Sequence, residues 1–248
     1  MVDTGFKFRN EFHLNPLINA DIFVPCGGRP EAVDLQNVHL LFNEDGLPRF
    51  KYIVEGANLF FTQEARLRLE RAHVVIFKDA SANKGGVTSS SLEVLAALAF
   101  TDQEFLEHMQ VRTSMPAFYA EYVKAVQAFI EKNAELEFEA LWREHNRTKK
   151  AISLLSDELS VAIVHLDEEL QKTTLWDNVP LRRVVLEEAF PKILLEKVGL
   201  DTLLKRVPES YVKAIFGSYL ASRFVYKYGI EPSQFAFFEF MSPYFNKA

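Results

Sequence analysis

Short apolar runs alternate with helical patterns between about residues 17 and 100. Runs rich in β-branched and aromatic residues occur at 20–25, 50–56 and 73–79, with little alternation between apolar and polar positions. Such runs are typical of strands in a parallel sheet that is covered on both faces. The sequence therefore predicts three parallel strands in this part of the chain.

The segments between these runs are predicted to be helices. One helix is expected to begin near Pro30, because proline is favoured in a first helical turn, and a turn at 43–48 ends that region. A second helix is expected over 62–69, with Thr62 as its N-cap. The order of strand, helix and strand favours right-handed crossovers and an α/β fold.

After Gly86 the pattern is helical throughout. Apolar residues occupy both sides of the first helix, at Leu92, Leu95, Ala96 and Ala99 on one side and Val94, Leu98 and Phe100 on the other. A helix that is apolar all round is a buried one. Further apolar stripes of helical period run over 115–130, 152–170 and 211–224, and the last of these is bounded by Pro208 and Gly229. They predict core packing of an antiparallel helical bundle.

Composition and charge exclude several classes of protein. The 248 residues carry a net charge of −6, which argues against a nucleic-acid-binding protein with its usual basic face. No apolar run approaches the roughly 20 residues of a membrane span, so no membrane association is expected. Cys26 is the one cysteine, which excludes an intrachain disulfide and a cysteine-based zinc site, and no metal site is expected. An intracellular location, cytoplasmic or mitochondrial, is the expectation.

Candidate chemistry lies in the loops that follow the predicted strands, at 25–30, 55–58 and 79–86. In open parallel sheets, ligands bind at the carboxyl ends of the strands, where these loops would meet. The loops are rich in small residues, and Asn58 and Asn83 offer both hydrogen-bond donors and acceptors. Two interpretations stand side by side: a nucleotide-type pocket, or glycines and asparagines that simply make turns.

Three segments at these loops resemble successive signatures of the glutamate/leucine/phenylalanine/valine dehydrogenase family. They are Ala20–Cys26, Val54–Asn58 and Asn83–Ser90, and their order and spacing match over roughly residues 17–100. The variant Pro-Cys-Gly-Gly-Arg-Pro at 25–30 and the long helical tail are more similar to the large NAD-specific glutamate dehydrogenases than to the small hexameric ones.

The resemblance implies residues that bind the cofactor. Pro25, Cys26 and Gly27 match a turn whose backbone lies against the nicotinamide ribose. Asn58 matches an asparagine that contacts the nicotinamide side of NAD. Asn83 matches an asparagine near both the carboxamide and the substrate.

The resemblance also implies substrate-binding residues, Asn83 and Ser90. Ser90 matches a serine that hydrogen-bonds the side-chain carboxylate of glutamate. Ser90 is expected near the start of a helix that begins at Gly85-Gly86, where free N–H groups and the helix dipole favour an anion. Ser89 and Ser91 are alternatives to Ser90 if the register differs by one. Lys84 replaces the alanine of the small dehydrogenases, and either pairs with an anion or is a solvated loop lysine.

The family's catalytic lysine and aspartate, and its glycine-rich pyrophosphate turn, have no counterpart in these residues. No Gly-x-Gly-x-x-Gly spacing occurs, and in the family these features lie upstream of the Pro-Cys segment. No catalytic residue is therefore expected in this chain. The resemblance implies a partial Rossmann-like parallel sheet followed by an all-helical C-terminal region. Residues 1–100 would be the C-terminal half of an NAD-binding domain and residues 101–248 the helical region.

The favoured function is that of a C-terminal part of an NAD-dependent glutamate dehydrogenase, inactive alone. The parent enzyme would convert L-glutamate and NAD to 2-oxoglutarate, ammonia and NADH, as a homo-oligomer. The alternative is a non-catalytic helical regulatory or assembly module. A dehydrogenase for leucine, phenylalanine or valine is disfavoured, because Ser90 suits a polar substrate side chain.

Overall fold

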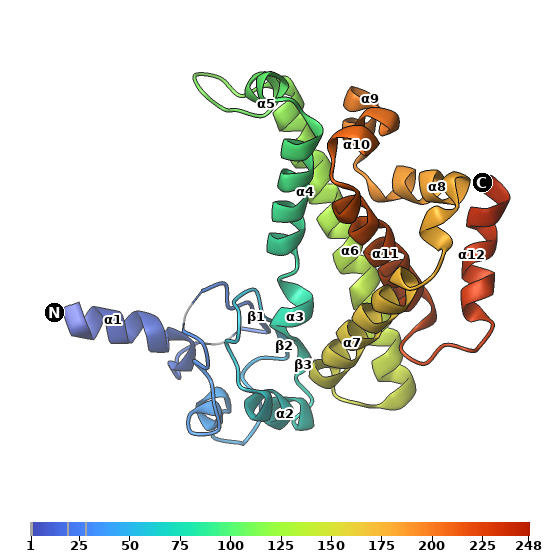
Figure 1. The fold of residues 1–248 in the computed structure, drawn as a ribbon. Coiled ribbons are helices and arrows are strands. Elements are labelled where there is room, and N and C mark those ends of the chain that lie inside the picture. The colour runs from blue at the N-terminus through green and yellow to red at the C-terminus, as the bar shows by residue number, and fades with distance from the viewer. Residues whose placement is uncertain (1, 19, 28) are drawn as a thin grey trace. The chain divides into compact units, whose positions relative to one another are not determined.

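The computed structural model describes residues 2–18, 20–27 and 29–248 (Figure 1). Its strands are β1 (Ile22–Phe23), β2 (Tyr52–Val54) and β3 (Val75–Phe77). Its α-helices are α1 (Val2–Glu11), α2 (Gln63–Arg71), α3 (Asp79–Ala82), α4 (Gly85–Ala99), α5 (Asp102–His108), α6 (Ala117–Thr148), α7 (Ile152–Gln171), α8 (Val179–Ala189), α9 (Lys192–Val198), α10 (Leu200–Arg206), α11 (Glu209–Tyr228) and α12 (Ala236–Lys247). Short 3₁₀ helices lie at η1 (Phe12–Leu14), η2 (Val38–Leu41) and η3 (Leu175–Asp177).

The chain divides into two compact units. The first consists of Met1–Lys84 together with Leu141–Glu158, and the second of Gly85–Ala140 together with Leu159–Ala248. The end of α6 and the start of α7 thus belong to the first unit. The functional division expected at residue 100 stays a prediction.

The three strands form a parallel sheet in the order β1-β2-β3, which confirms the predicted α/β character (Figure 1). In the register of the sheet, Ile53 lies beside Ile76, and both are fully buried. On the opposite face, Ile22 and Tyr52 are 57% and 47% exposed. Val54, Val75 and Phe77 on this face are half-buried, so among the described residues the second face is covered only in part and not fully as expected.

The core of the first unit lies on the face of Ile53 and Ile76. Its fully or almost fully buried members are Val33, Val38, Leu41, Phe50, Ile53, Phe60, Phe61, Ala65, Leu69, Val74 and Ile76. Phe23 packs against this cluster, with its ring stacked on Phe50 at a centroid distance of 4.9 Å. Burial of these aliphatic and aromatic side chains stabilises the short sheet.

The helix predicted near Pro30 is not present, and this prediction was wrong. Glu31 has a φ of 56°, which a non-glycine residue in an α-helix does not adopt. Val33 then runs parallel to the chain before α2: its N–H donates to Phe60 O (3.0 Å), and its carbonyl accepts from Thr62 N (2.9 Å). The segment is extended because Val33 forms hydrogen bonds of the parallel-strand type with Phe60 and Thr62 in place of hydrogen bonds within a helix. In place of the predicted α-helix, the short 3₁₀ helix η2 follows.

Helix α2 agrees with its prediction. The Thr62 hydroxyl caps the helix by accepting a hydrogen bond from Ala65 N at 3.3 Å. Ala65 and Leu69 are buried against the sheet. An N-cap threonine and an apolar i, i+4 pair are sufficient local signals for a helix of this length.

The helices predicted after Gly86 are confirmed, with one correction. In α4 the predicted inner face is buried, and the Tyr122 hydroxyl of α6 donates to Leu92 O at 2.7 Å. The opposite side is only partly buried: Phe100 is 7% exposed as predicted and Leu98 is half-buried, but Val94 is 47% exposed.

The apolar stripes correspond to α6, α7 and α11. Helix α11 ends at Gly229, whose φ of 86° lies in the left-handed region that favours glycine. Within the second unit, the buried Tyr226 hydroxyl of α11 donates to Glu137 of α6 at 2.7 Å. Burial, followed by the nearby Glu137 charge, raises the pKa of Tyr226, so the phenol remains a donor. None of the described helices combines the length and apolar character that a membrane span requires.

Candidate functional site

The loops after β1 and β2 lie in direct contact. The amide of Ala57 donates to Pro25 O at 2.7 Å. A Cβ on Gly56 would lie 3.1 Å from Cys26 Sγ and 3.2 Å from Pro25 O, so a side chain there would press on both. The glycine therefore lets the two loops approach closely. Gly27 is exposed, as is the free thiol of Cys26, whereas Gly28 lies outside the described residues.

The loops after β2 and β3 also meet. The Asn83 side-chain amide donates to Asn58 Oδ1. Asn83 follows α3, and its backbone N–H donates to Asp79 O at 3.0 Å. The structure thus brings together Asn58 and Asn83, the two asparagines that the sequence placed 25 residues apart. That hydrogen bond leaves Asn58 Nδ2 and Asn83 Oδ1 for other partners.

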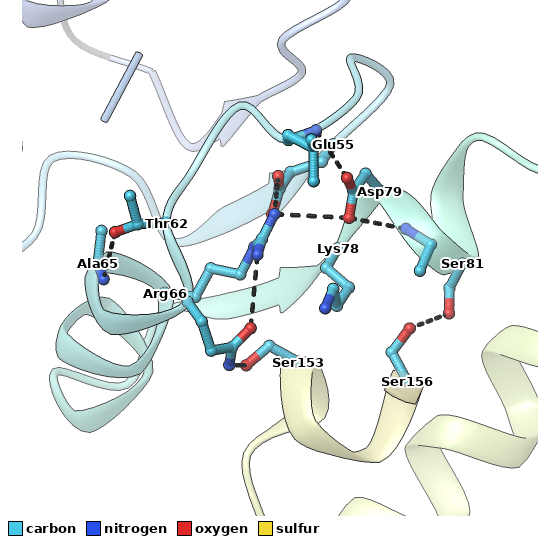
Figure 2. A network of polar contacts seen from close by, with 12 residues as sticks. Glu55, Thr62, Ala65, Arg66, Lys78, Asp79, Ser81, Ser153 and Ser156 are labelled. Atoms are coloured by element: carbon cyan, nitrogen blue, oxygen red, sulfur yellow. Dashed lines mark hydrogen bonds and ion pairs between the residues drawn. The ribbon is translucent and has the colours of Figure 1, made fainter. Parts of the chain in front are cut away.

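Asp79, the first residue of α3, connects the segment of Asn83 to the loop of Asn58 through its side-chain carboxylate. Its Oδ2 accepts from Leu59 N at 2.7 Å and its Oδ1 from Ala80 N at 2.8 Å (Figure 2). Leu59 has a φ of 55°, in the left-handed region. The Leu59 carbonyl in turn accepts from Glu31 N at 2.6 Å.

A buried ion cluster lies beneath the site, and Figure 2 shows its centre at Arg66. The guanidinium donates to both carboxylate oxygens of Glu55, at 2.7 and 2.8 Å, and lies 3.5 Å from Asp79 Oδ1. Glu55 is 0%, Arg66 3% and Asp79 7% exposed. Burial raises the pKa of the Glu55 carboxyl, and the hydrogen bonds from Arg66 lower it in part. The bidentate geometry makes these charge-assisted hydrogen bonds short and directional, and the loss of either partner would leave an uncompensated buried charge.

Sequence reasoning missed this cluster. Glu55 and Asp79 entered only as loop residues, and Arg66 was not singled out. A usable signal was present, because Glu55 ends an apolar strand, and a carboxylate that is buried needs a cation or several N–H donors. The partner that satisfies it lies on α2, eleven residues further on.

The start of α7 is bound to this part of the first unit through polar contacts. The Ser153 hydroxyl donates to Glu70 at 2.6 Å and accepts from Gln63 at 2.9 Å. Lys78 pairs with Asp157 at 2.8 Å, and in Figure 2 the hydroxyls of Ser81 and Ser156 face each other at 2.5 Å. Burial raises the pKa of the Glu70 carboxyl, and the bonds from Ser153 oppose the rise.

Ser90 belongs to the second unit, on the second turn of α4. Its side chain is exposed, and its hydroxyl donates to Gly86 O at 3.1 Å. The Ser89 hydroxyl donates to the same carbonyl at 2.9 Å. A hydroxyl has one proton, so Ser90 must release Gly86 O before it can donate to a carboxylate.

No grouping of three or more His, Cys, Asp or Glu side chains suited to a metal ion occurs among the described residues.

Comparison with known proteins gives close relatives. The chain is 59% identical over 244 residues to the NAD-specific glutamate dehydrogenase of Neurospora crassa, covering 98% of this chain and 23% of that protein. It is 60% identical over 242 residues to glutamate dehydrogenase 2 of Dictyostelium discoideum (97% and 23%) and 45% identical over 250 residues to the NAD-specific glutamate dehydrogenase of Saccharomyces cerevisiae (97% and 23%).

The chain thus spans less than a quarter of the length of these curated relatives. No solved structure matches it. The family model for glutamate/leucine/phenylalanine/valine dehydrogenases matches residues 4–149, which include all three loops and α4. The resemblance inferred from the loop motifs is therefore confirmed, and the chain belongs to the glutamate/leucine/phenylalanine/valine dehydrogenase family.

Proposed function

We propose that this chain is part of an NAD-dependent glutamate dehydrogenase and supplies one side of its nicotinamide and substrate site. The reaction of the whole enzyme is oxidative deamination of L-glutamate to 2-oxoglutarate and ammonia. Relatives of 45–60% identity that are named glutamate dehydrogenases support this assignment over leucine, phenylalanine or valine as substrate.

The observation that carries the proposal is the contact between Asn58 and Asn83. Asn58 after β2 and Asn83 after α3 form one polar surface, at the edge of the sheet where ligands bind in open α/β folds. Asn58 is exposed, so this surface is accessible. Turn formation alone does not require the side chains of the two loops to bond to each other.

The residues present fit a nicotinamide nucleotide. Asn58 Nδ2 and Asn83 Oδ1 are a donor and an acceptor of the kind that a carboxamide and ribose hydroxyls need. The exposed backbone of Cys26 and Gly27 has room beside it, since a Cβ on Gly27 would meet nothing within 4 Å. In this assignment Pro25, Cys26, Gly27, Asn58 and Asn83 hold the cofactor. NAD, when bound, accepts the hydride.

Ser90 and Asn83 are assigned to the substrate. Ser90 lies near the amino end of the 15-residue α4, where unpaired N–H groups and the helix dipole favour a carboxylate. Its side chain is exposed, and rotation about χ1 turns the hydroxyl from Gly86 O towards a ligand.

In the full-length enzyme, Ser90→Ala is expected to raise the KM for glutamate about 10- to 150-fold. The loss corresponds to one hydrogen bond to a charged group, about 1.5–3 kcal/mol, while NAD affinity stays nearly unchanged. Initial rates at varied glutamate and saturating NAD measure the effect. Ser89→Ala is the matched control, because its hydroxyl bonds the same Gly86 carbonyl. A normal KM for Ser90→Ala, or an equal rise for Ser89→Ala, contradicts the assignment.

Asn58→Ala and Asn83→Ala are each expected to lower turnover about 100-fold with little change in thermal stability. Both side chains lie in loops at strand ends, where a misplaced nicotinamide costs rate rather than folding free energy. Steady-state kinetics beside melting curves give both quantities. Asn43→Ala is the control, since the Asn43 side chain stabilises a turn by accepting from Leu47 N at 2.8 Å. A variant that melts early and turns over normally identifies a structural asparagine.

The wider assignments are part of the same proposal. Residues 1–100 complete a cofactor domain and 101–248 form a helical region of a homo-oligomeric, intracellular enzyme, cytoplasmic or mitochondrial. The alternative, a non-catalytic regulatory or assembly module, is favoured by Phe235 and Phe238, which are 76% and 72% exposed at the start of α12. The full reading frame discriminates: a catalytic lysine and a Gly-x-Gly-x-x-Gly turn elsewhere in it support the enzyme.

A further inference from the structure

We propose that Asp79 is a positioning residue that sets Asn58 and Asn83 against each other. The inference rests on the proposed function for the roles of the two asparagines. The geometry itself comes from the contacts of one carboxylate, which lies under both loops and is 7% exposed. No sequence motif singled out this role.

Asp79 belongs to the segment that leads to Asn83, and its carboxylate binds the Asn58 loop. Oδ2 accepts from Leu59 N, next to Asn58, at 2.7 Å. Oδ1 accepts from the N–H of Ala80, the next residue in the chain, at 2.8 Å, and the backbone carbonyl of Asp79 accepts from Asn83 N at 3.0 Å. A rigid planar group thus spans the two chain segments, and the Asn58–Asn83 hydrogen bond forms above it.

The backbone conformation of Leu59 depends on its hydrogen bond to Asp79. Its left-handed φ of 55° is disfavoured for a leucine, so the conformation needs fixed partners on both sides of the peptide. Asp79 receives its N–H, and Glu31 N donates to its carbonyl at 2.6 Å. The same residue therefore links the Asn58 loop to the segment that follows Cys26 and Gly27.

The positive charge of Arg66 offsets part of the free-energy cost of burying the Asp79 carboxylate. Its guanidinium compensates Glu55 through two short hydrogen bonds and reaches Asp79 Oδ1 at 3.5 Å. An asparagine at position 79 has nearly the same shape but only one acceptor atom. The Arg66 guanidinium favours the remaining oxygen at the Oδ1 position, so the NH₂ group would face Leu59 N, and the Asn58 loop would lose its bond to residue 79.

The test uses the full-length enzyme with Asp79→Asn, Asn58→Ala and the double variant. We expect Asp79→Asn to lower kcat/KM for NAD at least tenfold. In the double variant, kcat/KM should fall no further than in the more damaged single variant, because Asp79 acts through Asn58. Glu70→Gln is the control: it neutralises a half-buried carboxylate in the same unit that contacts Ser153 and neither loop, and its kcat/KM should stay within twofold of wild type.

A second readout does not depend on activity. In a cryo-electron-microscopy map of full-length Asp79→Asn, we expect the Asn58 and Asn83 side chains to be separated. Side chains that remain bonded overturn the proposal, whatever the kinetics. The proposal is also overturned if the losses of kcat/KM in Asp79→Asn and Asn58→Ala multiply in the double variant. It is overturned as well if the kcat/KM of Asp79→Asn stays within twofold of wild type, like that of Glu70→Gln. In either case Asp79 is a structural residue. If wild-type protein does not oxidise glutamate, the proposed function fails, and the map alone decides the role of Asp79.

Discussion

Arg66→Met is expected to destabilise the first unit by about 3–5 kcal/mol. The substitution leaves the Glu55 carboxylate fully buried with no cation, and breaking one side of a buried pair costs this much because the remaining charge is uncompensated. Hydrogen exchange of peptides from β2, α2 and β3 measures the loss locally, as faster exchange of strand and helix amides.

Lys132→Met is the matched control for this effect. Lys132 pairs with Glu135 at 2.7 Å, but both side chains are more than half exposed, so the expected loss is only about 0–1 kcal/mol. If peptides from β2, α2 and β3 exchange no faster in Arg66→Met than in Lys132→Met, the interpretation of Arg66 and Glu55 as a stabilising buried pair is wrong.

The loss in Arg66→Met should depend on pH in a defined direction. Burial raises the pKa of Glu55, and removal of Arg66 takes away the hydrogen bonds and charge that lower it. An acid whose pKa is higher in the folded state destabilises the fold as pH rises above its unfolded value of about 4.3. The difference between variant and wild type should therefore be largest near pH 7–8 and shrink as pH falls towards 4.

The second large effect concerns activity. The 248-residue chain alone is expected to show no NAD-dependent oxidation of glutamate. It offers no glycine-rich pyrophosphate turn and no counterpart to the catalytic lysine or aspartate implied by the family resemblance. Loss of general acid–base groups removes about 10²–10⁴-fold each, and loss of the pyrophosphate site removes much of the affinity that positions the nicotinamide.

NADH absorbance over a wide range of protein concentration tests this expectation, with full-length enzyme at matched concentration as the control. Calorimetric titration with NAD shows binding separately from turnover. A rate that rises in proportion to added chain, and survives removal of host dehydrogenases, means that these residues contain a complete active site.

The sequence predicted the loops after β1 and β2 because turn chemistry is local, whereas the loop expected at 79–86 is mostly helical, since α3 occupies Asp79–Ala82 and α4 begins at Gly85. Gly56 and Asn58 follow the end of β2, Asn83 follows the short helix α3 after β3, and the parallel order of the strands brings these segments to one edge. Thr62 and Gly229 likewise marked the ends of helices through caps that depend on a few neighbouring residues.

The sequence failed where distant contacts override local preference. Pro30 favours a helix start, but Val33 pairs with Phe61 and extends the backbone. The apolar pattern of α4 did not show which face is covered, and Val94 is exposed. The partners within the charge cluster at Arg66 could not be predicted, because no spacing rule links residues 55, 66 and 79. Only the packing of α2 against the strands brings these side chains together.

The discontinuous make-up of the first unit determines when it can be completed during synthesis. Ser153 follows its partner Glu70 by 83 residues, and Asp157 follows Lys78 by 79. At about 5–20 residues per second, a ribosome needs roughly 4–16 s to make the intervening chain. During that interval α2 and β3 are present without the start of α7. The nascent chain therefore exposes Glu70 and Lys78 to water until helices of the second unit have emerged, and the long loop to be closed favours slow final assembly.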